Sequence, residues 1–141
     1  MFILDTNVIS AVMRPDLNPI IIAWLDAQRL GDLRLTAVSL HEITFGIERS
    51  PLGRKRASLE TSLAEILRRE LGATILDFDA DAAWHSGICQ LKADRAVGHY
   101  DIPDCLVAGT AVAHGASVAT RNIRDFRHFG IPLIDPWLVT P

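Results

Sequence analysis

Acidic side chains follow separate apolar segments of the sequence, and carboxylates placed in this way can bind a divalent cation. Asp5 comes directly after the apolar residues 2–4, Glu42 follows the apolar segment 33–37, and Asp104 lies in the first turn of a predicted buried helix. Oxygen ligands without an accompanying His or Cys suit Mg²⁺ or Mn²⁺ and do not suit Zn²⁺. Such ions prefer phosphate oxygens as further ligands, so this set of acids predicts phosphoryl chemistry.

Grouping these acids without a cation is costly. Two unit charges about 5 Å apart repel by roughly 3 kcal/mol at an effective dielectric constant near 20. Three such pairs approach about 10 kcal/mol, which is comparable with the ~5–15 kcal/mol stability of a typical domain. Protonation of one acid or binding of a divalent cation would relieve this repulsion.

Each acid also has a structural interpretation, and spacing alone leaves both open. Asp5 fits a helix N-cap. Residues 39–42 fit a capping box, in which the side chain of Glu42 returns a hydrogen bond to the Ser39 amide. In residues 101–104, Asp101 fits a cap, and Asp104 is favoured by the helix dipole.

Alternating strand and helix patterns predict the elements that position these acids. Strands are expected at residues 2–4, 33–37, 73–78, 116–119 and 132–134. Helices are expected at 7–13, 39–47 and 54–71, the last with Gly72 as its C-cap, and further helices are expected to begin at Pro19, Asp79 and Asp101. The helix that begins at Asp79 is expected to have an apolar side that includes Trp84, Ile88 and Leu91. This alternation predicts an α/β fold, with a central parallel sheet of four to five strands and helices on both faces. Because ligands bind beyond the carboxyl ends of parallel strands, the acids should meet at one sheet edge.

Length and composition suit one domain over residues 1–141, with 49% hydrophobic residues and a net charge of −3. That charge argues against a protein that coats nucleic acid, although a metal and a local basic rim still permit a nuclease. The candidate basic stretch is 53–56, with Arg68 and Arg69 further on, and its simplest interpretation is a solvated helix face. We expect no signal peptide and no membrane association. Cys89 and Cys105 form no framework, so a reduced, cytoplasmic setting is expected, and Cys105 is interpreted as a core residue.

Five segments, taken in order, resemble the PIN-domain family, and more closely its VapC/FitB-type toxins of bacterial toxin–antitoxin systems. They are LDTNVIS at 4–10, SLHEITFGI at 39–47, DCLVAGTAVAHG at 104–115, VATRNIRDF at 118–126 and IPLIDPW at 131–137. The resemblance covers essentially the whole chain. It implies a PIN-like three-layer sandwich and a metal-dependent ribonuclease.

The resemblance also implies roles for individual residues. Asp5, Glu42 and Asp104 fall on the family's acid positions and would hold Mg²⁺, or alternatively Mn²⁺. The fourth acid position falls on Asn122 in some relatives and on Asp125 in others, so a second metal stays open. The side chains that would orient the acids or the attacking water are Thr6, Asn7, Thr120 and Asn122.

The implied partners are a cognate VapB-like antitoxin, a second copy of the chain in a homodimer, and operator DNA only through the antitoxin complex. Our hypothesis is hydrolysis of an RNA phosphodiester, in which Glu42 helps to take a proton and Asp125 positions water or a second ion. RNA contacts are sought among Arg14, Arg49, Arg121 and Arg124, with no sequence argument to choose between them.

Two alternatives from other classes are kept. A phosphomonoesterase of the haloacid-dehalogenase type would need a second acid at position 7, where Asn7 stands. A catalytically weak domain that acts mainly as a DNA-binding complex with its antitoxin would have little use for the three acids that this sequence keeps.

Overall fold

The computed structural model describes residues 1–69 and 75–139. Within these ranges the chain forms a parallel five-stranded sheet with the strand order β3-β2-β1-β4-β5. The strands are β1 (Phe2–Leu4), β2 (Leu33–Thr36), β3 (Ile75–Leu76), β4 (Ser117–Ala119) and β5 (Leu133–Ile134). The helices are α1 (Thr6–Val12), η1 (Pro15–Leu17), α2 (Pro19–Asp26), η2 (Leu30–Asp32), α3 (Ala37–Glu48), α4 (Arg54–Arg69), α5 (Ala80–Val97), α6 (Ile102–Ala113), α7 (Ile123–Phe126) and η3 (Arg127–Phe129).

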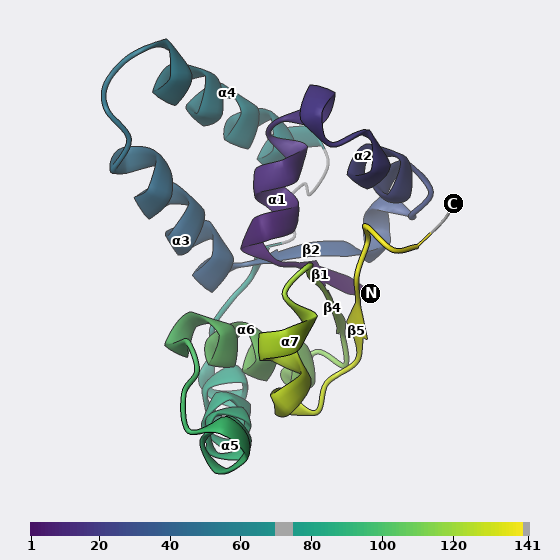
Figure 1. The fold of residues 1–141 in the computed structure, drawn as a ribbon, viewed down its shortest axis with the longest axis vertical. Coiled ribbons are helices and arrows are strands. Elements are labelled where there is room, and N and C mark those ends of the chain that lie inside the picture. The colour runs from purple at the N-terminus through teal and green to yellow at the C-terminus, as the bar shows by residue number, and fades with distance from the viewer. Residues whose placement is uncertain (70–74, 140–141) are drawn as a thin grey trace.

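The sheet separates two layers of helices, as Figure 1 shows. Successive side chains of a strand point to opposite faces, and β1 follows this rule: Leu4 packs in the core beneath α1 to α4, whereas Ile3 packs in the core beneath α5 to α7. Both residues are almost completely buried. The predicted α/β class, the parallel sheet and the helices on both faces are therefore confirmed.

The predicted strands agree closely with the observed ones. The prediction for 73–78 is observed at Ile75–Leu76, while residues 73–74 and the expected C-cap Gly72 lie outside the described residues. The short helix α7 and the turn η3 that follows it were not predicted, since four and three residues are too few to show a periodic pattern.

The predicted start of α3 is wrong. The N-cap is Thr36, whose side-chain oxygen accepts a 2.9 Å hydrogen bond from the amide of Ser39. The Ser39 hydroxyl is 2.9 Å from the Thr36 hydroxyl, and both side chains are fully buried. The N-cap thus lies three residues before the expected cap Ser39. The capping-box interpretation of Glu42 therefore does not hold, and its carboxylate is available for other contacts.

The long helix α5 does not pack through its large apolar residues. Trp84, Ile88 and Leu91 are exposed, with 73%, 43% and 48% of their surface accessible. The buried side chains of α5 are instead Ala82, Ser86, Cys89 and Ala93. Small residues here let α5 approach α6 closely, and this close packing decides which face of the helix is buried.

The predicted cap of α5 is confirmed, because the Asp79 side chain accepts a 2.9 Å hydrogen bond from the amide of Ala82. In the basic stretch, Arg56 pairs with Glu48 and, at 2.8 Å, with Glu60, so part of its charge is neutralised within the protein. No helix in the described ranges is long and apolar enough to cross a membrane.

Candidate metal centre at the strand ends

Two neighbouring strands place the first polar residues of the site side by side. Leu4 of β1 pairs with Ala119 of β4, and both strands end at this pair. Asp5 and Thr120 therefore leave the same edge of the sheet, where the amide of Asp5 donates a 3.0 Å hydrogen bond to the carbonyl of Ala119. Asp5 is only 5% exposed and Thr120 is fully buried, so neither side chain is free to turn into solvent.

The Asp5 carboxylate accepts hydrogen bonds at both oxygens. The amide of Thr6 donates to Oδ1 at 2.7 Å, which makes Asp5 the N-cap of α1. The Asn7 amide group donates to Oδ2 at 2.6 Å, and the Thr120 hydroxyl donates to the same oxygen at 2.7 Å. The capping interpretation of Asp5 is therefore correct, and the same carboxylate is also the centre of a polar network.

The Thr120 hydroxyl extends this network toward α7. It accepts 3.0 Å and 2.9 Å hydrogen bonds from the side-chain amide of Asn7 and the backbone amide of Asn122. The side-chain amide of Asn122 in turn donates to Oδ2 of Asp125 at 2.6 Å. Asn122 is thus a donor that orients Asp125, and the residues predicted to follow β1 and β4 come together in one chain of hydrogen bonds.

The remaining predicted acids arrive from α3 and α6. Oε2 of Glu42 accepts a 2.9 Å hydrogen bond from the Thr6 hydroxyl, which ties α3 to the start of α1. Burial raises the pKa of Glu42, and repulsion from Asp5 and Asp101 adds to this, although the Thr6 hydrogen bond opposes it. Burial likewise raises the pKa of Asp5, against its three hydrogen bonds.

Asp104 carries the largest perturbation in this group. Burial raises its pKa to about 7, and repulsion from Asp5, Asp101, Glu42 and Asp125 contributes in that order. An acid surrounded by four other carboxylates stays charged at neutral pH only with difficulty. The site is therefore an anionic cluster whose charge is not neutralised by its own side chains.

Asp101 belongs to this cluster, and sequence reasoning missed it as a site residue. It is the N-cap residue of α6, as expected from its position, but its side chain makes no capping hydrogen bond. Its charge instead raises the pKa of both Glu42 and Asp104. The available signal was the spacing of three between Asp101 and Asp104, which places both on one face of the first helical turn.

The acid cluster fits a hard divalent cation because its members are carboxylates. The nearby Cys105 thiol is not available as a metal ligand. Cys105 is 1% exposed, and burial together with Asp104 raises its pKa to about 11, which confirms it as a core residue. No three Asp, Glu, His or Cys side chains within the described ranges converge on one ion position. Mg²⁺ is commonly held by one or two carboxylates, with water and substrate phosphate at its other positions, so the cluster remains compatible with it.

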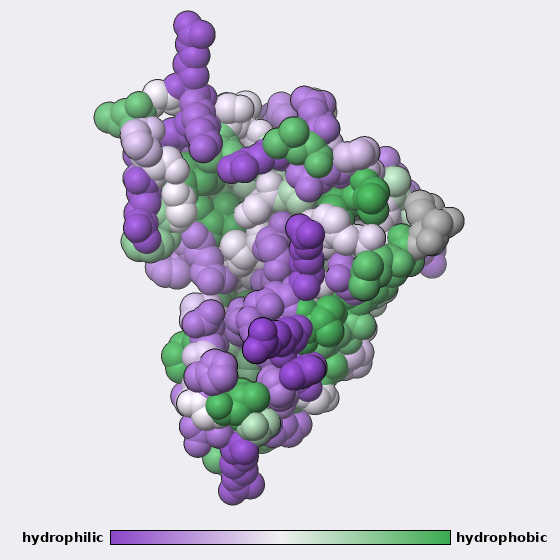
Figure 2. Space-filling model, in the orientation of Figure 1, coloured by the Kyte–Doolittle hydropathy of each residue, from purple (hydrophilic) through white to green (hydrophobic). Residues whose placement is uncertain are grey.

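The arginines predicted as RNA contacts have different surroundings. Arg124 lines a cavity together with Asp104 and Asp125. Arg49 lies over the ring of Phe45 and Arg121 over the ring of Trp137, each 5.4 Å from the ring centre. Arg14 lines a second cavity together with Thr6 and Glu42. Arg14 and Arg124 are therefore the two of these arginines that line a cavity with the acids. Figure 2 shows a mostly hydrophilic surface over α7 and the adjoining part of α6.

Comparison with known proteins identifies a family and relatives that match nearly the whole length of the chain. The sequence pattern of the PIN domain matches residues 2–132. The chain is 34% identical over 137 residues to the VapC ribonuclease Y4jK of Sinorhizobium fredii, covering 97% of this chain and 98% of that protein. It is 31% identical to the toxin FitB of Neisseria gonorrhoeae, covering 97% and 99% of the two chains.

Solved structures give the same relationship. A structure of FitAB bound to a DNA fragment, IR36, superposes with a TM-score of 0.88 at 30% identity, covering 100% of this chain and 99% of that chain. The crystal structure of FitAcB from Neisseria gonorrhoeae superposes with a TM-score of 0.83 at 31% identity, covering 99% and 100%. The likeness to FitAB covers the whole chain and so extends over both helix layers and the sheet.

Proposed function

Because this chain belongs to the PIN-domain family, we propose that it is the toxin nuclease of a VapBC-type toxin–antitoxin pair and hydrolyses RNA phosphodiester bonds with Mg²⁺ or Mn²⁺. The similarity to a VapC ribonuclease over almost the full length supports the class of activity. The observation that carries the metal requirement is Asp104, whose pKa is raised to about 7 by burial and by four neighbouring carboxylates. A divalent cation would offset this charge.

The hydrogen-bond network gives each side chain a role in this reaction. Asp5 and Asp104 would be the main ligands of the ion, and Glu42 would bind it directly or through a water molecule. The ion would lower the pKa of the attacking water and offset charge on the phosphate. Thr6 fixes the Glu42 carboxylate, whose raised pKa suits it to accept the proton of the attacking water. Asn122 fixes Asp125, so that this acid can orient water on the α7 side of the site.

The remaining supporting residues act on Asp5. Thr120 and Asn7 donate to the same oxygen of its carboxylate and favour its ionised form against the effect of burial. The other oxygen accepts from the amide of Thr6. A carboxylate held in this way needs little reorganisation when substrate binds.

Cleavage of RNA by the purified protein tests the proposal. The protein, freed from any copurifying antitoxin, is incubated with labelled single-stranded RNA in Mg²⁺, in Mn²⁺ and in EDTA. We expect cleavage with either metal, none in EDTA, and a loss of at least about a hundredfold in Asp5→Ala and Asp104→Asn. Arg68→Ala, on the far helix layer, is the matched control and should keep full activity. Cleavage that survives both EDTA and the two substitutions would refute the metal mechanism.

We also propose a cognate VapB-like antitoxin, a homodimer of this chain, and operator binding only through the antitoxin complex. The structure of FitAB bound to a DNA fragment supports the antitoxin and the operator DNA as partners. A cavity of about 230 Å³ between α1, α3 and α4 is lined by Thr6 and Glu42, so a segment seated there would lie against the acids. Coexpression with the adjacent reading frame, followed by light scattering and DNA-binding assays of the complex and of the free protein, tests all three.

A catalytically weak domain that serves only in operator binding is less well supported. Such a protein would have no need for five neighbouring carboxylates, whose mutual repulsion is unfavourable. Growth arrest on expression distinguishes the two functions: a nuclease should arrest growth as the native chain and lose this effect as Asp104→Asn.

A further inference from the structure

A cavity beside the acids has a lining that the proposed cation site does not use. Its volume is about 260 Å³, and it is bounded by the last turns of α5, the loop 98–101, the start of α6 and the segment formed by α7 and η3. Asp101, Asp104 and Asp125 belong both to this cavity and to the acid cluster. A group bound in the cavity would therefore be directly next to the reacting phosphate.

The lining also contains two cationic side chains, one of them in the residue that precedes Asp125. Arg124 and Arg127 both line the cavity and are both exposed. The ion pairs among the described residues involve Arg56 and His85, and none uses Arg124 or Arg127. Nε of Arg127 donates to Nε2 of His128 at 3.3 Å, which leaves its two terminal nitrogens for a ligand. An arginine fork of this kind matches the oxygens of a phosphate group.

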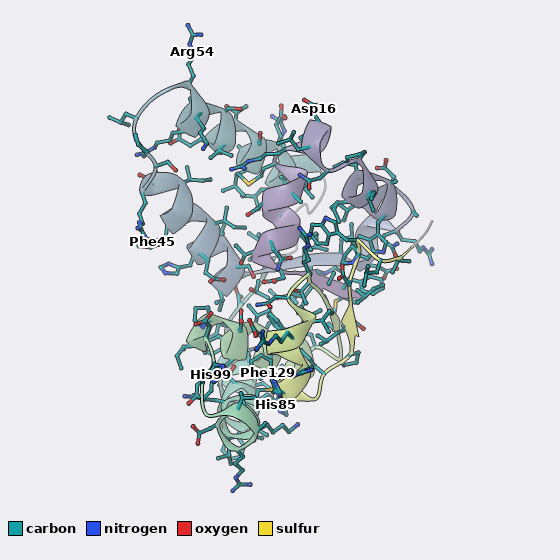
Figure 3. The ribbon with its side chains drawn as sticks, in the orientation of Figure 1. Asp16, Phe45, Arg54, His85, His99 and Phe129 are labelled. Carbon is teal, nitrogen blue, oxygen red and sulfur yellow. The ribbon has the colours of Figure 1, made fainter. Side chains whose placement is uncertain are left out.

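The loop 98–101 adds flat side chains to the same cavity. Gly98 ends α5 with φ +71°, a left-handed conformation that favours glycine, and the chain then turns so that His99 and Tyr100 line the cavity. Tyr100 is half-buried and packs on the core beneath α5 and α6, while its hydroxyl accepts a 3.2 Å hydrogen bond from Gln90. His99 and Phe129, both labelled in Figure 3, line the same cavity.

We propose that this cavity binds one unpaired nucleotide of the substrate, next to the scissile phosphate. The base would stack on Tyr100 and His99, and the adjoining phosphate would be held by Arg124 and Arg127. A nucleotide in a duplex is stacked and paired on both sides, so only single-stranded RNA, or a loop, can supply it. This inference rests on the proposed RNA-cleaving function and adds where the substrate is held.

Steady-state cleavage of a short single-stranded oligoribonucleotide gives the first test. Arg127→Ala and Tyr100→Ala should each lower kcat/KM roughly tenfold, whereas Tyr100→Phe, which keeps the ring, should stay within about twofold of the native protein. Arg68→Ala is the control for loss of an exposed arginine elsewhere. Unchanged thermal melting of each variant would show that folding is intact.

Photocrosslinking gives a readout that does not depend on cleavage. Asp104→Asn protein with Mg²⁺ is irradiated with the same oligonucleotide carrying 4-thiouridine at its central position, and crosslinked peptides are mapped by mass spectrometry. Crosslinks in residues 97–101 or 124–129 support the subsite, even if the native protein fails to cleave RNA and the proposed function is thereby refuted. The subsite is overturned, and the proposed function is kept, if the native protein cleaves RNA, Arg127→Ala and Tyr100→Ala leave kcat/KM unaltered, and the crosslinks lie only in other segments.

Discussion

The hydroxyl group of Thr120 donates a 2.7 Å hydrogen bond to Oδ2 of Asp5, although 115 positions separate the two residues in the sequence. The bond joins the residues that follow β1 and β4, which are neighbours in the sheet. The same hydroxyl accepts hydrogen bonds from Asn7 and from the amide of Asn122. Thr120 therefore connects the buried acid with the segment that carries Asp125.

Replacing this hydroxyl should weaken both folding and catalysis. Thr120→Val removes one donor to a buried carboxylate and leaves two donors without their acceptor, so we expect a loss of about 2–3 kcal/mol in the free energy of unfolding. Thr120→Ser keeps the hydroxyl and should lose no more than about 1 kcal/mol. Urea unfolding measures both, and equal losses in the two variants would contradict the role of the hydroxyl.

Thr6 should affect catalysis through the pKa of Glu42, without itself accepting a proton. The Thr6 hydroxyl donates to Oε2 of Glu42 at 2.9 Å and lowers its pKa against the effect of burial. Thr6→Val should therefore shift the acidic limb of the kcat profile to higher pH, whereas Thr6→Ser should leave it in place. A profile that does not move in Thr6→Val would mean that Glu42 is not the group titrating in catalysis.

The metal-free protein should lose stability as the pH rises. The pKa of Asp104 is about 7 in the folded protein, against 3.8 for an unperturbed aspartate, which stands for the unfolded chain. Between these values the folded protein keeps a proton that the unfolded chain has released, so the free energy of unfolding falls with increasing pH and levels off above about pH 7.

Asp104→Asn isolates this contribution. In EDTA at pH 8 the free energy of unfolding of the variant should exceed that of the native protein by about 1–2 kcal/mol. This is less than the whole pKa difference would give, because solvent reaches part of the Asp104 side chain. Urea unfolding at pH 5 and pH 8 measures the difference. A variant that is less stable than the native protein at pH 8 would show that the cluster is not under electrostatic strain.

The contact between α5 and α6 should depend on the absence of a side chain at Gly109. A Cβ atom there would lie 2.6 Å from the carbonyl oxygen of Ala82 and would also collide with the side chain and backbone amide of Ser86. Gly109→Ala should therefore lower the free energy of unfolding by about 2–3 kcal/mol. Because α6 carries Asp104, activity should fall as well.

Gly87→Ala is the matched control on α5. A Cβ atom at Gly87 meets nothing within 4 Å among the described residues, so the substitution should gain about 0.5–1 kcal/mol from the better helix propensity of alanine. Thermal melting distinguishes the two variants. Similar stability of both would indicate that α5 and α6 are not as closely packed as described.

The acids at the strand ends could be predicted because parallel strands bring their carboxyl ends to one edge. Asp5 and Thr120 need only the correct order of β1 and β4 to meet, and the apolar segments predicted both strands. The start of α3 could not be fixed in the same way. Thr36 and Ser39 are both good N-cap residues, and the choice depends on their burial in the folded protein.

Other features depend on packing that a periodic pattern does not contain. Trp84 lies on the exposed side of α5 because the small residues of that helix pack against α6. Which side of α5 is buried can be predicted only when both helices are considered together. Asp101 was interpreted as a cap, although its carboxylate acts on Glu42 and Asp104 through space. Arg127 enters the cavity from a three-residue turn too short to predict.

The chemical ends of the RNA fragments test the central claim most directly, since they identify the nucleophile. If water activated at the acid cluster attacks the phosphate, a substrate with one 2′-deoxy residue at the cleavage site should be cut as well as RNA. Its products should carry a 5′-phosphate and a 3′-hydroxyl, and Asp104→Asn should give neither. Products ending in a 2′,3′-cyclic phosphate, together with failure to cut the 2′-deoxy substrate, would show that the RNA's own hydroxyl is the nucleophile and would contradict hydrolysis at these carboxylates.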